Sequence, residues 1–229
     1  MHVLLVLAVV LASSCAGYTT SAPIVFDVLP SDDVKIETRT GGIRMSDVLS
    51  DAEVVFATNG GIFERPETPT GLLISGGQEQ SSTNLGEGSG NFFLKPNGVL
   101  FRTDNGQWKI LEAQEFESHR PLVEKNVTDA TQSGPMLLRH GTIHHSIRES
   151  SENKLLRSAA CVDPKGGLHL IMSRVGITFH ALATISIEKS CTDALYLDGV
   201  ISSVLVSGNV LPSENKNRRY ASMIVVRRR

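Results

Sequence analysis

Four polar clusters in this sequence contain the residue types that could bind an anion and carry out hydrolysis. Each lies at the end of an apolar run; they are Asn59-Gly60-Gly61, Gln132-Ser133-Gly134, Arg157-Ser158, and Asp198-Gly199 with Ser202-Ser203. Consecutive glycines let backbone N–H groups converge into an anion-binding nest. The guanidinium group of an arginine is a permanent, planar charge suited to phosphate. Together these clusters could hold an anionic ligand, whereas any one of them alone would be an ordinary turn.

Asp198 is the best-placed carboxylate in this pattern. It follows Ala-Leu-Tyr-Leu, a run apolar enough to be a strand buried on both faces. A carboxylate at the end of such a strand is held rigidly and is only partly hydrated, as a general base or a nucleophile requires. Asp-Gly between two apolar runs is also the commonest signal for a simple β-hairpin. Glu64, directly after Asn-Gly-Gly-Ile-Phe, is a second candidate carboxylate.

The arginine and the histidines each have a plainer interpretation. Arg157 could be a surface residue in a salt bridge that contributes little. His140 and His144 are four residues apart, a spacing that brings two metal ligands together only on a helix. Gly141 and the β-branched residues after it disfavour a helix there. We therefore expect no metal and no other cofactor.

Strands dominate the elements that must position these residues. An apolar run leads directly into Asn59, and residues 71–112 alternate short apolar runs with Gly, Asn and Asp. Asn97-Gly98 is typical of a tight hairpin turn, and His140-Gly141 predicts another. The loop over residues 76–90 is long enough to suggest a role in binding.

Helices are expected in three places. Residues 178–190 have helical spacing with Thr178 as N-cap. A short helix is predicted over residues 45–52, with Ser46 as N-cap, and another over residues 112–118. The fold class is therefore α+β, a strand-dominated single domain with a few short helices.

Composition and charge are those of a globular protein without a nucleic-acid partner. The 229 residues carry a net charge of −2, and 41% of them are hydrophobic. No global positive field would attract nucleic acid, and the length suits one sizeable core.

The first 22 residues predict export. An apolar run of about ten residues, too short to cross a bilayer, precedes small residues and a polar linker, as in a secretory signal. The stretch LASSC resembles a bacterial lipobox, in which Cys15 would be lipidated and would anchor the protein in a membrane. A plain signal peptide cut nearby is the alternative. Residues 23–229 would then be the mature domain, in the periplasm, on the cell envelope or outside the cell, where Cys161 and Cys191 could form a disulfide or remain buried thiols.

Five motifs, in a fixed order, resemble the phosphodiester glycosidase family. They are TNGGIF at 58–63, GNFFLKPNGVLF at 90–101, TQSGPMLL at 131–138, LLRSAACVD at 155–163 and DALYLDGVISSVLV at 193–206. The resemblance runs from about residue 54 to residue 226 and is nearest to short exported bacterial members. It implies an α+β fold with a mixed central β-sheet, and hydrolysis of a sugar-1-phosphodiester.

Carried onto this chain, the family's motifs fall on the same polar clusters. The resemblance implies that Asp198 acts as base or nucleophile and that Arg157 binds the phosphate. Asn59 and the backbone amides beside it would orient sugar hydroxyls or phosphate oxygens. Substrate contacts are implied for Gly60, Gly61, Phe63, Gln132, Ser133, Gly134, Gly199, Ser202 and Ser203.

In one place the chain departs from the family pattern. Where that pattern resembles Leu-Asp-Gly-Gly-Gly-Ser, this chain has Leu-Asp-Gly-Val-Ile-Ser-Ser, with Val200 and Ile201 in place of two glycines. The two side chains remove positive-φ freedom and add bulk, so the loop cannot approach a ligand in the same way. Specificity for N-acetylglucosamine therefore does not carry over with the resemblance.

The predicted reaction needs one carboxylate rather than two. Ordinary glycosidases protonate a poor leaving group with a second carboxyl group, but a phosphomonoester leaving an anomeric carbon is already a stable anion. One carboxylate, with positive or N–H groups around the phosphate, then suffices. The expected substrate is a phosphorylated glycan or another sugar-1-phosphodiester. Two alternatives remain: a phosphodiesterase that cuts the P–O bond, and a non-catalytic envelope module that binds anionic glycans.

Overall fold

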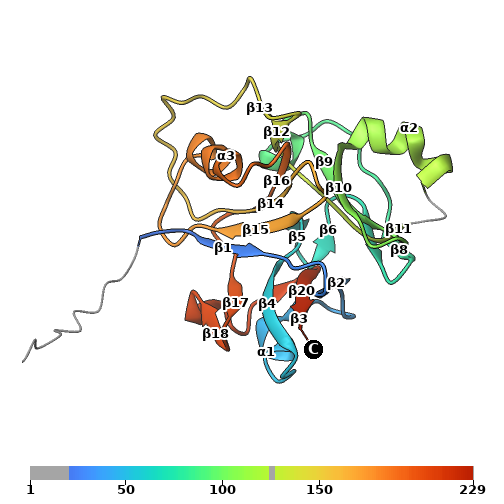
Figure 1. Ribbon diagram of the computed structural model, residues 1–229, viewed down its shortest axis with the longest axis vertical. Helices are drawn as coiled ribbons and strands as arrows, with labels where there is room; N and C mark the ends of the chain where they lie inside the picture. Colours follow the sequence, from blue (N-terminus) through green and yellow to red (C-terminus); the bar gives the residue numbers. More distant parts are fainter. Residues whose placement is uncertain (1–20, 124–126, 229) are drawn as a thin grey trace, which may run out of the picture.

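The structure is a computed structural model that describes residues 21–123 and 127–228 (Figure 1). The predicted export signal, with Cys15, lies outside the described residues. Strands dominate, as expected, and the α-helices of the described chain are α1 (Met45–Val48), α2 (Ala113–Val123) and α3 (Phe179–Glu188). None of these helices is long and apolar enough to cross a membrane.

Three sheets build the molecule. The β16 sheet contains β1 (Ile24–Asp27), β12 (Met136–Arg139), β13 (Thr142–Ile143), β14 (Ser158–Val162), β15 (Leu168–Met172) and β16 (Asp193–Asp198). The β9 sheet contains β7 (Leu73–Ser75), β8 (Gln78–Ser81), β9 (Gly98–Thr103), β10 (Trp108–Glu112) and β11 (Val127–Ser133). The β4 sheet contains β2 (Asp33–Glu37), β4 (Val54–Asn59), β17 (Val204–Val206), β18 (Asn209–Leu211) and β20 (Met223–Arg227). Two short pairs complete the described strands: β3 (Ile43–Arg44) with β19 (Arg219–Tyr220), and β5 (Phe63–Glu64) with β6 (Thr68–Pro69).

The sheets are antiparallel, which corrects the expectation of a mixed central sheet. Their strand orders are β1-β15-β14-β16-β12-β13, β10-β9-β11-β7-β8 and β18-β17-β4-β20-β2. A mixed sheet needs two parallel neighbours joined by a long crossover. The crossover through α3 does connect β15 to β16, but β14 lies between these strands and runs antiparallel to both.

The three sheets share one core. Their inner faces meet in a hydrophobic cluster that includes Phe56 from the β4 sheet, Leu100 from the β9 sheet and Leu195 from the β16 sheet. A separate cluster lies on the outer face of each sheet, where α3, α2 and α1 cover the β16, β9 and β4 sheets respectively (Figure 1). Burial on both faces explains why the strands read as continuous apolar runs rather than as alternating ones.

Local predictions succeeded where the signal lies within a few residues. Thr178 caps α3, because its Oγ1 accepts a hydrogen bond from the Ala181 amide at 3.1 Å. The predicted turn at His140-Gly141 joins β12 to β13, with φ of 51° and 77°. The N-cap of α1 is Arg44 rather than Ser46.

The hairpin predicted at Asn97-Gly98 is wrong. Gly98 is the first residue of β9, and β9 turns into β10 around Gly106, whose φ is 84°. Asn97 is buried because its side chain donates to the Phe92 carbonyl at 3.2 Å and accepts from Gln132 at 3.3 Å. The asparagine is therefore there to form hydrogen bonds with other parts of the chain, and it does not form a turn.

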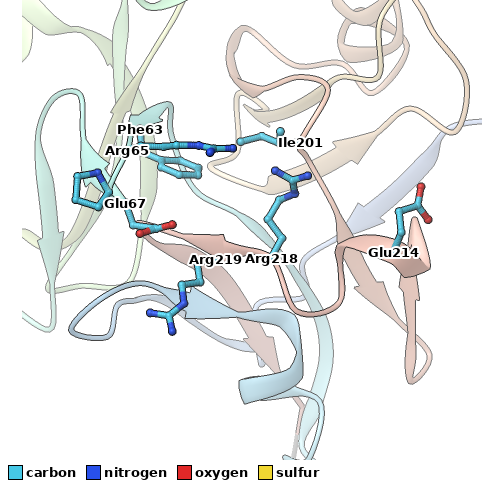
Figure 2. A pocket seen from close by; sticks show the side chains of 8 residues that line it. Phe63, Arg65, Glu67, Ile201, Glu214, Arg218 and Arg219 are labelled. Carbon is cyan, nitrogen blue, oxygen red and sulfur yellow. The ribbon is translucent and has the colours of Figure 1, made fainter.

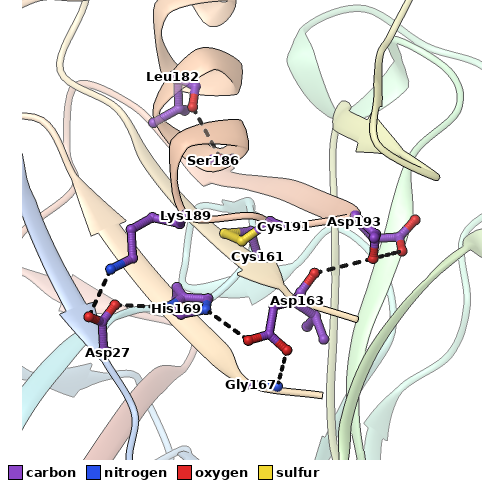
Figure 3. Close-up of a disulfide and its surroundings, with 12 residues drawn as sticks. Asp27, Cys161, Asp163, Gly167, His169, Leu182, Ser186, Lys189, Cys191 and Asp193 are labelled. Atoms are coloured by element: carbon purple, nitrogen blue, oxygen red, sulfur yellow. Dashed lines mark hydrogen bonds and ion pairs between the residues drawn. A yellow bond between two sulfur atoms is a disulfide. The ribbon is translucent and has the colours of Figure 1, made fainter. Parts of the chain in front are cut away.

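Cys161 of β14 forms a disulfide with Cys191, just before β16 (Figure 3). An ion-pair network lies beside it: Asp27 of β1 accepts from Lys189 and from His169 of β15, each at 2.8 Å. On the far side of the same imidazole, Asp163 lies 3.6 Å away. The disulfide and this network tie β1, β14, β15 and the end of α3 together.

Candidate active site

A β-bulge places the Asp198 carboxylate. Along the β14–β16 pair, Asp198 faces Ser158 and Tyr196 faces Ala159, so Leu197 is an extra residue in β16. The carbonyls at the bulge accept hydrogen bonds from serines: Leu197 O from Ser133 Oγ at 2.8 Å, and Asp198 O from Ser158 Oγ at 3.4 Å. Bulges re-aim a side chain and are common beside active sites.

After Asp198 the chain does not form a hairpin but crosses between sheets. Residues 199–203 carry it from β16 to β17, which pairs with β4. The Gly199 amide donates to Asp198 Oδ1 at 2.6 Å, and the Ser202 amide donates to Gly199 O at 2.7 Å. A Cβ at Gly199 would lie 2.4 Å from the Tyr196 hydroxyl, so any side chain here would displace that hydroxyl. The Asp-Gly pair thus holds a carboxylate at a junction between two sheets.

The environment of Asp198 favours its protonated form. Burial raises the pKa of this carboxyl to about 6, and this rise is only partly offset by the Gly199 amide and the charge of Arg218. No ion pair to Asp198 is present in the described part of the chain. Asp198 itself is half-buried, and an unpaired carboxylate with a pKa close to neutral is a typical feature of catalytic sites.

Two tyrosines near Asp198 were missed in the sequence: Tyr196 lies in an apolar strand, and Tyr220 follows the polar stretch Lys-Asn-Arg-Arg. Burial, followed by the charge of Asp198, raises the pKa of Tyr196. Burial also raises the pKa of Tyr220 to about 12. Tyr220 Oη donates to Ile201 O at 2.8 Å and is hydrogen-bonded to Ser203 Oγ. Both hydroxyls therefore stay protonated and can act as hydrogen-bond donors beside the carboxylate.

Arg157 is not a surface residue. It is only 1% exposed; its Nε donates to Ile177 O at 2.8 Å and its Nη2 to Asn153 O at 3.1 Å. The guanidinium lies 3.8 Å over the Phe179 ring and 5.7 Å from the centre of the Tyr196 ring. Burial lowers its pKa, and its Nη1 has no hydrogen-bond partner. The reading as a surface salt bridge is therefore wrong, and Arg157 reaches the Asp198 region through Tyr196.

The backbone amides at Gly60 and Gly61 are already used inside the protein. Gly60 N donates to Ser222 O at 2.9 Å and Gly61 N to Thr131 Oγ1 at 3.1 Å. A Cβ at Gly61 would lie 2.3 Å from Gln132 O. These glycines permit close packing, and the expected anion nest does not form from their amides.

Asn59 helps to hold the crossover after Asp198. Its Oδ1 accepts from the Ser203 amide at 3.3 Å, and its Nδ2 donates to Gly60 O at 3.1 Å. Ser202 Oγ and Ser158 Oγ are 3.0 Å apart and form a hydrogen bond. Asn59, Ser202 and Ser203 thus fix the segment that carries the carboxylate.

The Gln132 cluster supports a neighbouring loop. Gln132 Oε1 accepts from the amides of Leu72 at 3.0 Å and Asn84 at 2.9 Å, which holds the 76–90 loop against β11. Gly134 packs so closely that a Cβ would lie 2.8 Å from Phe92 O. Ser133, besides contacting Leu197, accepts from the Ile62 amide at 3.2 Å.

A cleft of about 620 Å³ opens beside the crossover. Figure 2 shows its lining: Phe63, Arg65, Pro66, Glu67, Ile201, Glu214, Arg218 and Arg219. Phe63 is half-buried there and meets the Tyr220 ring edge-on at 6.1 Å. Glu64 is exposed on β5 and is not one of the lining residues, whereas Glu67 is.

The structure thus brings Asn59, Ser133, Ser158 and Asp198 together, although they come from four different strands. Five of the predicted residues hold the Asp198 segment, namely Asn59, Ser133, Gly199, Ser202 and Ser203. Phe63 lines the cleft instead. Tyr196, Tyr220 and Arg218 join them without any signal in the local sequence.

Three comparisons bear on these residues. The family model described as phosphodiester glycosidase matches residues 52–227. The protein YigE of Escherichia coli (strain K12), itself uncharacterised, is 31% identical over 186 residues, which are 81% of this chain and 70% of that protein.

Among solved structures, the chain is similar to the zebrafish N-acetylglucosamine-1-phosphodiester α-N-acetylglucosaminidase catalytic domain auto-inhibited by its pro-peptide. The TM-score is 0.62 at 16% identity, over 93% of this chain and 85% of that one. A hypothetical protein from Synechocystis gives a TM-score of 0.61 at 14% identity, over 90% of this chain and 59% of that one. At these identities the likeness shows a shared fold.

Proposed function

Because the chain belongs to the phosphodiester glycosidase family, we propose that it hydrolyses the glycosidic bond of a sugar-1-phosphodiester. The observation that carries the proposal is the Asp198 carboxyl group: half-buried, without an ion-pair partner in the described chain and with its pKa raised to about 6. At neutral pH it is mostly ionised, yet it is close enough to its pKa to take up a proton during the reaction.

In the proposed reaction, Asp198 is the reacting side chain and the phosphomonoester is the leaving group. Asp198 either removes a proton from a water that attacks the anomeric carbon, or attacks that carbon itself to form a glycosyl ester, which a water then hydrolyses to free the sugar and the carboxylate. The bond between that carbon and the phosphate oxygen breaks, and its electron pair leaves with the phosphomonoester. Since this leaving group is already a stable anion, the second carboxyl group of ordinary glycosidases is not needed.

Several of the remaining residues act as positioning residues. Asn59, Ser133 and Ser158 hold the strand end and the crossover around Asp198. The charges of both Arg157 and Asp198 act on the Tyr196 hydroxyl, which can donate to a substrate oxygen. A group preorganised in this way costs no reorganisation in the transition state.

Val200 and Ile201 shape the specificity of the site. Val200 is 61% exposed and Ile201 lines the cleft, so both add apolar bulk where a glycine-rich loop would leave room. We therefore do not assign N-acetylglucosamine, the sugar in the zebrafish enzyme's name, to this chain. We place the protein in envelope or extracellular glycan processing, on the predicted export signal and on the Cys161–Cys191 disulfide, a bond typical of oxidising compartments.

The test is a panel of sugar-1-phosphodiesters, with released phosphomonoester as the readout. Hydrolysis in ¹⁸O-labelled water supports the proposal if the label enters the sugar. Label in the phosphate would show a P–O-cleaving phosphodiesterase instead. Binding of panel members without turnover over long incubation would show a non-catalytic glycan-binding module.

A further inference from the structure

Three arginines without carboxylate partners gather in the cleft beside the crossover. Arg65, Arg218 and Arg219 line it, and within the described chain none of them forms an ion pair. Other arginines do pair with aspartate or glutamate: Arg39, Arg102, Arg120, Arg139, Arg227 and Arg228. Arginines that lie near one another without ion-pair partners repel one another, and an anionic ligand would relieve that repulsion.

Arg218 is held in position by Asn215. Its Nε donates to Asn215 Oδ1 at 3.0 Å, so its two terminal nitrogens remain for a ligand. Asn215 is buried, and its Nδ2 lies 3.4 Å from Ile201 O and 3.5 Å from Ser202 O, to which it donates. Through this one amide side chain, the arginine is attached to the segment that follows Asp198. Such preorganisation reduces the cost of binding.

Arg65 approaches from the opposite wall, in the turn between β5 and β6. In Figure 2 the guanidinium groups of Arg65 and Arg218 extend toward the same space beside Ile201. Arg219 points away and donates to Gly41 O at 2.6 Å. Phe63, next to Arg65, and Ile201 supply apolar surface in the cleft. The carboxylates of Glu67 and Glu214 also line the cleft, so the cleft has little net positive charge. An anion would therefore be recognised by hydrogen bonds from the guanidinium groups of Arg65 and Arg218.

Arg218, which lines the cleft, lies close enough to Asp198 for its charge to act on that carboxylate. The charge of Arg218 acts on Asp198 and lowers its pKa against the effect of burial. It also acts on Tyr220, on the other side of the crossover. A group bound at Arg218 is therefore near the carboxylate, whereas Arg157 is buried and holds two backbone carbonyls.

We propose that Arg65 and Arg218 form a phosphate-binding subsite, in which one phosphate bridges the two guanidinium groups and its organic substituent contacts Phe63 and Ile201. Arginine forks match phosphate oxygens in geometry as well as charge. The inference rests on the proposed function in one respect: the phosphate bound at this subsite is taken to be the phosphate of the sugar-1-phosphodiester substrate.

The subsite is tested by isothermal titration calorimetry of the full chain with glycerol 3-phosphate, with glycerol as the uncharged control. Arg65→Gln and Arg218→Gln should each weaken binding by about tenfold or more, as expected for a lost charge-assisted hydrogen bond. Arg148→Gln removes a charge from an exposed residue outside the cleft and should leave binding unchanged. The subsite is overturned if the unmodified protein does not bind glycerol 3-phosphate, or if both cleft variants bind it as tightly as the unmodified protein does.

Asn215→Ala adds a test of the positioning argument. It keeps every charge but frees Arg218, so binding should weaken less than with Arg218→Gln. Unchanged binding would contradict the anchoring role of Asn215. Thermal denaturation of each variant shows whether the fold is retained.

Kinetics separate this inference from the proposed function. With any substrate found in the panel, Arg65→Gln and Arg218→Gln should raise KM more than they lower kcat. If both variants lose glycerol 3-phosphate binding while no panel member is hydrolysed, the subsite stands and the proposed function falls. If turnover is found and neither variant changes KM, the proposed function stands and the subsite falls.

Discussion

The two edges of the β16 sheet at which its strands end use carboxylates in opposite ways. At one end Asp198 faces Ser158 and has no cationic partner in the described chain; burial raises its pKa to about 6. At the other end, beside the Cys161–Cys191 disulfide, Asp27 is partly exposed and paired. Burial alone would raise the pKa of Asp27, but hydrogen bonds from Lys189 and His169 lower it (Figure 3).

The comparison shows that one end of the sheet contributes stability, whereas the other end provides a reactive group. The paired end is stabilised by a covalent bond and by ion pairs, and its carboxylates titrate below their usual range. The Asp198 end is destabilised at neutral pH, because a carboxylate must stay ionised in a buried site. Such a cost is typical of residues that are poised to react.

Of the variants that test the contrast between Asp198 and Asp27, Asp198→Asn should have the largest effect. We expect activity to fall by about 10²–10⁴-fold, the usual contribution of a general base. The same variant should be more stable at pH 7, by up to about 3 kcal/mol, since a shift of roughly two units is worth about 1.4 kcal/mol per unit. Steady-state kinetics and thermal denaturation measure the two effects.

The sign of the stability change provides a control. A carboxyl group with a raised pKa contributes stability below its unfolded pKa, near 3.8, and loses it as pH rises through about 6. The advantage of Asp198→Asn should therefore disappear below pH 4. Near-full activity in this variant would show that Asp198 is not the reacting group.

Removing the disulfide should have the next largest effect, confined to stability. The double variant Cys161→Ala/Cys191→Ala opens a link with a sequence separation of 30. We expect a loss of about 2–4 kcal/mol of unfolding free energy, as for other disulfides of this loop size. Activity at 25 °C should persist, because Asp198 is at the opposite end of the strand pair. A proportional loss of kcat in fully folded protein would contradict the separation of the two ends.

The pH dependence of kcat/KM tests whether Asp198, unlike the paired carboxylates, controls activity. If Asp198 must be ionised, kcat/KM should fall about tenfold per pH unit below about 6 and level off above it. Folding stability should not fall in that range, since the pKa values of Asp27 and Asp163 are lowered and their contribution is lost only below their usual range. A rate profile that is flat from pH 5 to pH 7 would exclude Asp198 as the base.

Asp27→Asn should have the smallest effect. The Asp27 side chain is 52% exposed, and exposed ion pairs contribute at most about 1 kcal/mol. We expect a slight loss of thermal stability, reduced further by salt, and no change in kcat/KM. A large kinetic effect would show that the two ends are coupled.

The sequence was sufficient for features determined over a few residues. The Thr178 cap, the His140-Gly141 turn and the position of Asp198 at the end of a buried strand are of this kind. Asn97-Gly98 shows the limit: the same turn signal marks a strand start, because Asn97 bonds with residues from other parts of the fold. Nothing in the local sequence distinguishes the two cases.

The candidate site was only partly predictable for the same reason. Its polar clusters were recognised, but their roles depend on which hydrogen bonds the fold has already used. The amides of Gly60 and Gly61 are consumed internally, and Arg157 is buried against Phe179. Arg218 lies beside Ile201 only in the folded chain, because the two residues are far apart in the sequence.

The link from Asn215 to the crossover also bears on how a chain of this kind can change in length. Between Ser203 and Asn215 the backbone leaves as the β17–β18 hairpin and returns, with an exposed tip at Ser207-Gly208. Because Asn215 closes this excursion at its base, residues inserted at the tip would not alter the spacing between Asp198 and Arg218. The hairpin is thus a natural place for added segments, such as tags or probes, that leave the chemistry intact.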